Sequence, residues 1–123
     1  MTGRTPLVLL LLPLAACFGE GMMGGSTVDI PPPAAPTAAA AHCNAIDEMS
    51  TCVEYADKAI AEADCNSFGG SVGEGACPSE GLTGTCAHDG KGRKYYGTGG
   101  MPADAAYAER HCRNAMAGEF TAP

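Results

Sequence analysis

Six cysteines between positions 43 and 112 are the feature that most limits how this chain can fold. The region that contains them, residues 43–123, has no tryptophan and few large aliphatic side chains, so it can bury only a thin apolar core. A core of this size supplies roughly 3–5 kcal/mol, and such domains are usually stabilised by covalent cross-links. We therefore expect a small disulfide-stapled domain. The six residues are Cys43, Cys52, Cys65, Cys77, Cys86 and Cys112.

Zinc binding is the alternative role for these cysteines, because His42, His88 and His111 lie next to or near them. Structural zinc sites nearly always contain two cysteines two to four residues apart, and the chain has no such pair. The spacing also argues against a thiol oxidoreductase and against covalent haem attachment. We therefore favour disulfides and expect neither a metal nor a cofactor.

The pairing of the six cysteines stays open, because six cysteines allow fifteen connectivities. If residues 44–65 form one helix, Cys43 and Cys52 lie about 13 Å apart and Cys52 and Cys65 about 20 Å apart at 1.5 Å per residue, so the first three cysteines cannot bond to one another. Each would then pair with one of the last three. If the helix breaks near Tyr55, local pairs such as Cys65–Cys77 and Cys86–Cys112 become possible.

An internal repeat organises the cysteine-rich region. The segment "ADKAIAEADC" at 56–65 aligns with "ADAAYAERHC" at 103–112, and each is followed by glycine and a lone large apolar residue. Cys43 and Cys52 have the same spacing as Cys77 and Cys86. We therefore divide the domain into two copies, about 43–72 and 77–120.

The repeat predicts capped helices followed by short strands. Asp57 and Asp104 are good N-cap residues, and Gly69 and Gly118 suit the ends of the helices. Ile60 and Tyr107 occupy equivalent positions, which we expect to face inward. Short strands are expected at Val72 and Phe120.

The resulting fold class is α+β, with two short helices against a small antiparallel sheet. The helices are expected at about 44–66, with a kink as an alternative, and at 104–115. A hairpin is expected near 82–97, because Asp89-Gly90 is the strongest turn signal in the chain. Residues 44–55 are ambiguous: their apolar spacing favours a helix, whereas the repeat suggests that "CVEY" forms a strand.

The chain begins with the pattern of an export signal. Residues 1–16 contain Arg4 and then the apolar run "PLVLLLLPLAA", which has the length of a signal-peptide core and is too short to span a membrane. Residues 17–42 are dominated by glycine, proline and alanine, which is typical of a disordered spacer. We therefore expect an N-terminal signal helix, a linker and a domain at 43–123.

The run Leu14-Ala15-Ala16-Cys17 resembles the lipobox of bacterial lipoproteins. The resemblance implies that Cys17 is acylated, that residues 1–16 are removed and that the acyl chains anchor the protein in a membrane. Because residue 18 is Phe and not Asp, it implies the outer membrane, on its periplasmic or surface face. An odd cysteine in an exported chain needs such an explanation. Cleavage to a soluble secreted protein and a structural cysteine in an uncleaved helix are the alternatives.

A second, looser resemblance covers about residues 52–121. With Gly84-Thr85-Cys86 and Tyr95-Tyr96, this region is similar to uncharacterised cysteine-rich domains of other bacterial lipoproteins. That resemblance implies no activity.

The charge distribution argues against a nucleic-acid partner. The net charge is −7, and no part of the chain has the basic surplus that phosphate binding requires. One basic and aromatic run is a candidate contact surface for a protein or an envelope glycan, because such residues are favoured at interfaces. It consists of Lys91, Arg93, Lys94, Tyr95 and Tyr96.

These features predict a lipid-anchored binding or structural module and no catalytic residue. A small cell-envelope hydrolase is the first alternative, and it would require His88, His111 and an acid such as Glu109 to lie together in a cleft. A serine such as Ser71 has no recognised motif around it. A secreted inhibitor-like module that uses residues 88–94 as a probe is the second alternative.

Overall fold

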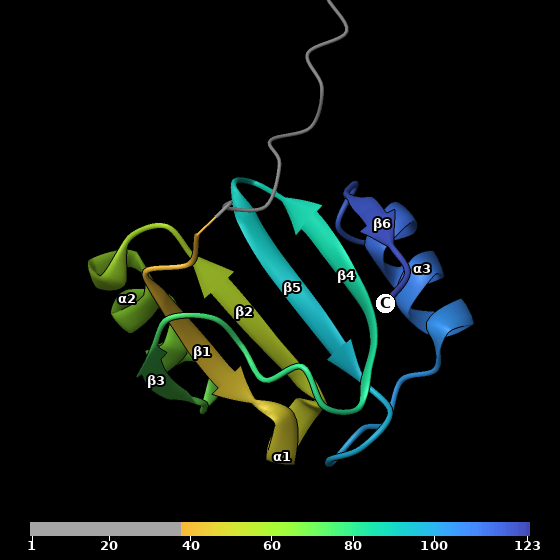
Figure 1. The fold of residues 1–123 in the computed structure, drawn as a ribbon, viewed down its shortest axis with the longest axis horizontal. Coiled ribbons are helices and arrows are strands. Elements are labelled where there is room, and N and C mark those ends of the chain that lie inside the picture. The colour runs from red at the N-terminus through yellow and green to blue at the C-terminus, as the bar shows by residue number, and fades with distance from the viewer. Residues whose placement is uncertain (1–37) are drawn as a thin grey trace, which may run out of the picture.

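A computed structural model of the chain describes residues 38–123 as an α+β domain with one six-stranded antiparallel sheet (Figure 1). The α+β class predicted from the sequence is confirmed. The expected signal segment, Cys17 and the linker up to residue 37 lie outside the described residues. In chain order the elements are β1 (Ala41–Ala45), α1 (Ile46–Met49), β2 (Thr51–Tyr55), α2 (Lys58–Phe68), β3 (Ser71–Glu74), β4 (Leu82–His88), β5 (Lys91–Tyr96), α3 (Ala105–Asn114) and β6 (Glu119–Thr121).

The prediction of one helix over 44–66 is wrong for its first half. Residues 41–45 and 51–55 are paired strands, separated by the single turn of α1. Ser50 ends that turn in the left-handed conformation with φ 53°, which stops helical propagation. The β-branched and aromatic residues of β2 fit a pleated strand better than a helix. The repeat, which suggested a strand at "CVEY", was the better guide.

The other predicted elements are present. Asp57 and Asp104 cap α2 and α3, and their carboxylates accept backbone N–H bonds of 2.7 Å from Ala59 and Tyr107. Gly69 ends α2 with φ 72°. Gly118 does not end α3 in the same way, because this helix stops at Asn114 with Ala115 as its C-cap. The hairpin turns at Asp89-Gly90, where two successive positive φ angles match the twist of the flanking strands.

The sheet has an approximate two-fold arrangement. Its strand order is β3-β1-β2-β5-β4-β6. The unit β1-β2-α2-β3 and the unit β4-β5-α3-β6 therefore lie on the two sides of the β2–β5 pair, with equivalent strands at equal distances from it. Cys43 faces Val53 on one side and Val72 on the other. Cys86 correspondingly faces Arg93 and Phe120. Because Val53 also faces Arg93, the approximate axis passes through that pair.

Two disulfides hold equivalent places in these units. Cys43–Cys65 ties α2 to β1, and Cys86–Cys112 ties α3 to β4, with Cα–Cα distances of 5.4 and 5.5 Å. The expectation of disulfides is therefore confirmed. The arrangement required by a continuous helix, in which no two of the first three cysteines pair, is wrong. Of the two local pairs considered, Cys86–Cys112 is present, whereas Cys65 bonds Cys43 and not Cys77.

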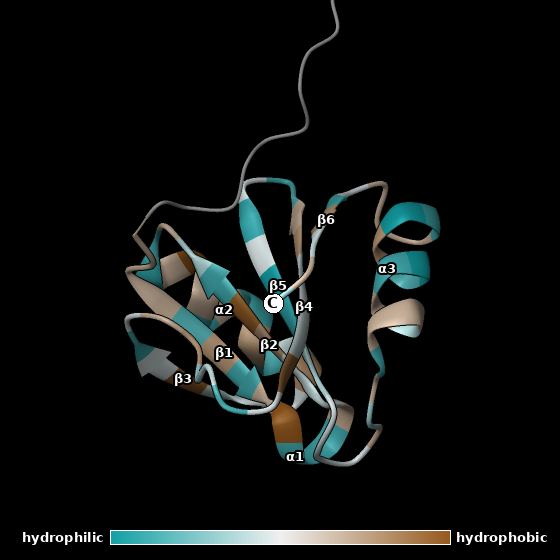
Figure 2. Cartoon of the chain, turned by 45° about the vertical axis from the view of Figure 1, so that its right-hand side comes forward, coloured by the Kyte–Doolittle hydropathy of each residue, from teal (hydrophilic) through white to brown (hydrophobic). Residues whose placement is uncertain are grey.

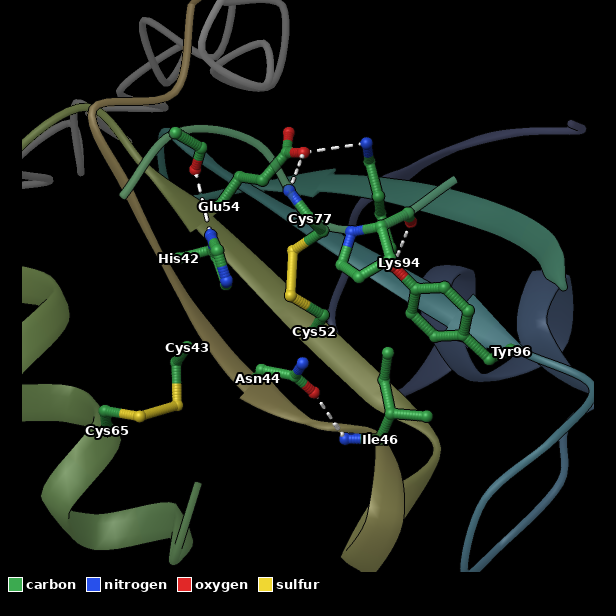
Figure 3. The surroundings of a disulfide bond; sticks show 12 residues. His42, Cys43, Asn44, Ile46, Cys52, Glu54, Cys65, Cys77, Lys94 and Tyr96 are labelled. Atoms are coloured by element: carbon green, nitrogen blue, oxygen red, sulfur yellow. Dashed lines mark hydrogen bonds and ion pairs between the residues drawn. A yellow bond between two sulfur atoms is a disulfide. The ribbon is translucent and has the colours of Figure 1, made fainter. Parts of the chain in front are cut away.

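The third disulfide, Cys52–Cys77, has no counterpart, so Cys77 is not the equivalent of Cys43 that the spacing suggested. It fastens the segment between β3 and β4, which crosses the face of the sheet opposite the helices (Figure 1). Glu54 reinforces this crossing, since its carboxylate accepts the Cys77 N–H at 2.9 Å and lies 2.7 Å from the Lys94 Nζ (Figure 3). The Tyr96 hydroxyl donates to the Pro78 carbonyl at 2.6 Å.

Small residues lie where each helix meets the sheet. Ala61 and Ala108 are fully buried, one turn before the bridging cysteines. Ile60 and Tyr107, which we expected to face inward, are 51% and 45% exposed. The disulfides bring the helices so close to the strands that alanine and cysteine fill the contact, and the larger neighbours point to the side.

The disulfide connectivity can be checked directly, because cleavage after glutamate separates all six cysteines. Mass spectrometry of the unreduced digest should show Cys43–Cys65, Cys52–Cys77 and Cys86–Cys112 as linked peptides. A peptide that joins Cys65 to Cys77 would contradict the structure.

Gly118 should be intolerant of any side chain. A Cβ at this position would lie 2.5 Å from the Cys86 Sγ and 2.7 Å from the Ala87 carbonyl oxygen. We expect Gly118→Ala to lower the free energy of unfolding by about 1–3 kcal/mol, measured by denaturant titration of the oxidised protein. Gly97→Ala is the control, because its Cβ would meet nothing closer than 3.4 Å. Equal stability of the two variants would refute the close approach.

Candidate functional site

A cavity of about 370 Å³ lies on the helix side of the sheet, beside α3 and at the end where β2 begins and β5 ends. We call it the Arg93 cavity. Its wall is mainly apolar, with a small number of polar groups at the sheet and on α3. The lining residues are Met49, Thr51, Arg93, Tyr95, Met101, Pro102, Ala103, Tyr107 and His111.

Two connections that the repeat does not share build the rim of this cavity. The first is α1 with Ser50, and the second is the loop 97–104 before α3. They are held together by hydrogen bonds from the Met101 N–H to the Ser50 Oγ at 2.9 Å and from the Gly100 N–H to the Ile46 carbonyl at 3.2 Å. Figure 2 shows α1 at the foot of the sheet, with a brown hydrophobic part next to a teal hydrophilic part. This contact places Met49 and Met101 at the cavity.

Arg93 supplies the positive charge of the site. Its side chain is only 9% exposed, and its Nε is buried without a hydrogen-bond partner. The guanidinium carbon lies 5.7 Å from the centre of the Phe68 ring. Within residues 38–123, Arg93 forms no ion pair with a carboxylate. Most buried charges are paired, so this one is unusual.

Aromatic and imidazole groups complete the polar side of the cavity. A hydrogen bond of 2.9 Å joins the Tyr95 hydroxyl to the His111 Nδ1, and the Tyr107 ring stacks on the His111 ring at 5.8 Å. Burial lowers the pKa of His111, and the charge of Arg93 lowers it further. Burial raises the pKa of Tyr95. Both groups are therefore neutral at neutral pH, which leaves Arg93 as the charge of the site.

A smaller cavity of about 100 Å³ occupies the equivalent place in the first unit. We call it the Lys91 cavity. Tyr55, Ile60 and Asp64 hold the positions that Tyr95, Tyr107 and His111 hold in the second unit. Here Lys91 donates a hydrogen bond of 2.6 Å to the Asp64 carboxylate. The hydrogen bond from Lys91 is the main cause that lowers the pKa of Asp64.

The expected contact surface does not form a single exposed patch. Because side chains alternate along β5, Lys91, Arg93 and Tyr95 point to the helix side, whereas Lys94 and Tyr96 point to the opposite face. Tyr95 and Tyr96 are 1% and 0% exposed. Burial raises the pKa of Tyr96 to about 12. The basic and aromatic composition pointed to β5, but it did not predict that most of the side chains of this strand are buried.

The residues of the hydrolase alternative are not gathered in one site. Glu109 pairs with Arg113 on the exposed side of α3, at 3.0 Å. Ser71 lies on the edge strand β3, and three strands separate it from His88 on β4. The Nε2 atom of His88 is buried without a partner. Among residues 38–123, no three histidine, cysteine, aspartate or glutamate side chains are grouped so that they could hold a metal ion.

Sequence reasoning missed the cavity itself. It named Arg93, Tyr95 and His111, but it did not place them together, and it gave no role to Met49 or Met101. The longer loop before the second helix was the one sequence signal that could have pointed to this end of the sheet.

Comparisons of the chain with protein-family models, with curated proteins and with solved structures find no match. The three disulfides indicate an oxidising extracellular or periplasmic environment. In the part of the chain that the structure describes, no helix is both long and apolar enough to cross a membrane.

His88, which is buried, and His111, which is partly buried, predict how the stability of the fold responds to acid. Burial, and then the charge of Arg93, lowers the pKa of His88 as well as that of His111. The unfolded chain therefore binds protons first as the pH falls below about 6.5, and the folded state is destabilised by up to about 1.4 kcal/mol per pH unit for each histidine. Urea unfolding at pH 7.5, 6.5 and 5.5 measures this loss.

The double variant His88→Gln/His111→Gln should show a flatter pH dependence over the same range. If the wild-type protein and the double variant lose stability in parallel between pH 7 and 5.5, the two histidines are not its cause.

Proposed function

We propose that this chain is an exported bacterial lipoprotein, anchored to the outer membrane through acyl chains on Cys17, with a C-terminal binding domain. The observation that carries this proposal is the pairing of the cysteines. All six between positions 43 and 112 bond to one another, so residues 38–123 leave no thiol for Cys17. The seventh cysteine follows Leu14-Ala15-Ala16 directly after the apolar run, where a lipidated cysteine is expected.

The linker fits such an anchor. A proline-rich chain extends by about 3.1 Å per residue, so the stretch between Cys17 and β1 could place the domain up to roughly 70 Å from the membrane. The domain is thereby free to meet a protein, a glycan or a small molecule of the envelope.

The Arg93 cavity supports a binding role rather than a purely structural one. A scaffold gains nothing from an unpaired charge in an apolar cavity, whereas a binding site uses such a group to orient its ligand. The cavity also lies at the end of the domain where the two unshared connections meet, and not in the part that the repeat needs for folding.

Anchoring is tested on the mature protein. Mass spectrometry of its N-terminus should find residue 17 first and acylated, and Cys17→Ser should leave an unprocessed precursor that still contains three disulfides. Ser26→Cys/Cys17→Ser is a suitable control, because it keeps the number of cysteines but moves the thiol away from the signal segment. A soluble wild-type product that starts elsewhere would refute the proposal.

A further inference from the structure

We propose that the Arg93 cavity binds a small amphipathic monocarboxylate, whose carboxylate pairs with Arg93 and whose apolar body fills the space beside α3. This inference rests on the binding role proposed above and names the class of ligand. It follows from the charge, from the comparison of the two cavities and from the lining of the larger one.

The charge argument begins with the missing partner of Arg93. Arg93 as a residue is 9% exposed, and its Nε is buried and donates to no acceptor, so this N–H has lost its hydration without gaining an anion. The charge of Arg93 shifts the pKa of four titratable groups, and none of them carries a negative charge at neutral pH. They are Tyr55, His88, Tyr95 and His111. The planar fork of a guanidinium matches a carboxylate with two parallel hydrogen bonds. A bound carboxylate would therefore give the buried Arg93 Nε an acceptor and its charge a partner.

The Lys91 cavity acts as an internal comparison. In that cavity the side chain of Lys91, which also comes from β5, lies between the sheet and the helix. Its Nζ is 2.6 Å from the Asp64 carboxylate, which neutralises its charge. The position equivalent to Asp64 in the second unit is His111, which has no negative charge to offer Arg93. The first unit thus supplies its own carboxylate to the cation, whereas the second unit has no carboxylate at the equivalent position.

The lining defines the rest of the ligand. Met49, Met101 and Tyr107 are 37%, 62% and 45% exposed and form an apolar entrance, and Pro102 adds to it. Flexible methionines adapt to apolar groups of different shape. A volume of about 370 Å³ is at the lower end of the range for small-molecule pockets. A second ligand charge would lie against these apolar groups, so one carboxylate on a short alkyl or aryl body fits best.

Octanoate is a suitable probe. Octanol, which keeps the alkyl chain but lacks the carboxylate, and acetate, which keeps the carboxylate but lacks the long chain, are the two controls. Binding is measured by calorimetry on the full oxidised chain carrying Cys17→Ser, so that no acyl chain of the protein competes. Octanoate should bind about 10-fold to 100-fold more tightly than octanol, which lacks the charge-assisted hydrogen bonds. Acetate should bind more weakly than octanoate, and the Arg93 Nε–Hε signal in NMR spectra should shift with octanoate.

Variants locate the site. Arg93→Met should weaken octanoate binding about 10-fold to 100-fold, while the melting temperature stays equal or rises because an unpaired buried charge is removed. Arg113→Met removes a guanidinium from the exposed side of α3 and should change neither quantity. A fall in melting temperature with unchanged octanoate binding would mean that Arg93 is structural, and would overturn the proposal.

A second pair of variants stays informative if Arg93→Met fails to fold. His111→Asp gives the second unit the carboxylate that Asp64 gives the first, and it should abolish octanoate binding. His111→Asn removes the imidazole without adding charge and should keep most of the binding. The proposal is overturned if octanoate fails to bind, if octanol binds equally well, if acetate binds as tightly as octanoate or if His111→Asp binds normally. None of these results affects the acylation of Cys17, so the ligand class and the anchor are tested separately.

Discussion

One disulfide holds α2 against the first half of the sheet, and an equivalent disulfide holds α3 against the second half. The packing of the rest of the domain depends on how close these bonds bring each helix to its strands. With about 5.5 Å between the bonded Cα atoms, the residues that α2 and α3 bury are all alanine or cysteine. Gly70 and Gly118 occupy equivalent places against the sulfur atoms of Cys43 and Cys86. The larger helical residues are displaced to the sides, where Ile60 and Tyr107 line the two cavities. The cross-links that replace an extensive core thus also create the space beside each helix.

The difference between the two units turns one of these spaces into a candidate binding site. At the sheet centre, Val53 in one unit corresponds to Arg93 in the other. The first unit has the added turn α1, and the second has the added loop 97–104; both meet at one end of the sheet. The strands, helices and disulfides that the two units share form the framework of the domain. The features that differ between them, namely α1, the loop 97–104 and Arg93, form the Arg93 cavity.

The two faces of the sheet differ in how completely their charges are paired. On the face crossed by the β3–β4 segment, Glu54 and Lys94 neutralise each other at 2.7 Å (Figure 3). On the helix face, Lys91 is neutralised by Asp64, and Arg93 has no carboxylate within residues 38–123. Since a buried charge without a partner is costly to the folded state, Arg93 is the residue whose presence folding explains least.

The sequence by itself determined the role of the cysteines, the α+β class, the capped helices and the turn at Asp89-Gly90, because each depends on a residue type or on neighbours a few positions away. It misassigned residues 44–55, because a short apolar run becomes a strand or a helix according to the partners that pair with it. Only the tertiary structure decided that Cys65 bonds Cys43. It alone showed that Arg93 is buried and unpaired. Disulfide choice and burial depend on segments far apart in the chain, and their approach is set by the packing of the whole sheet.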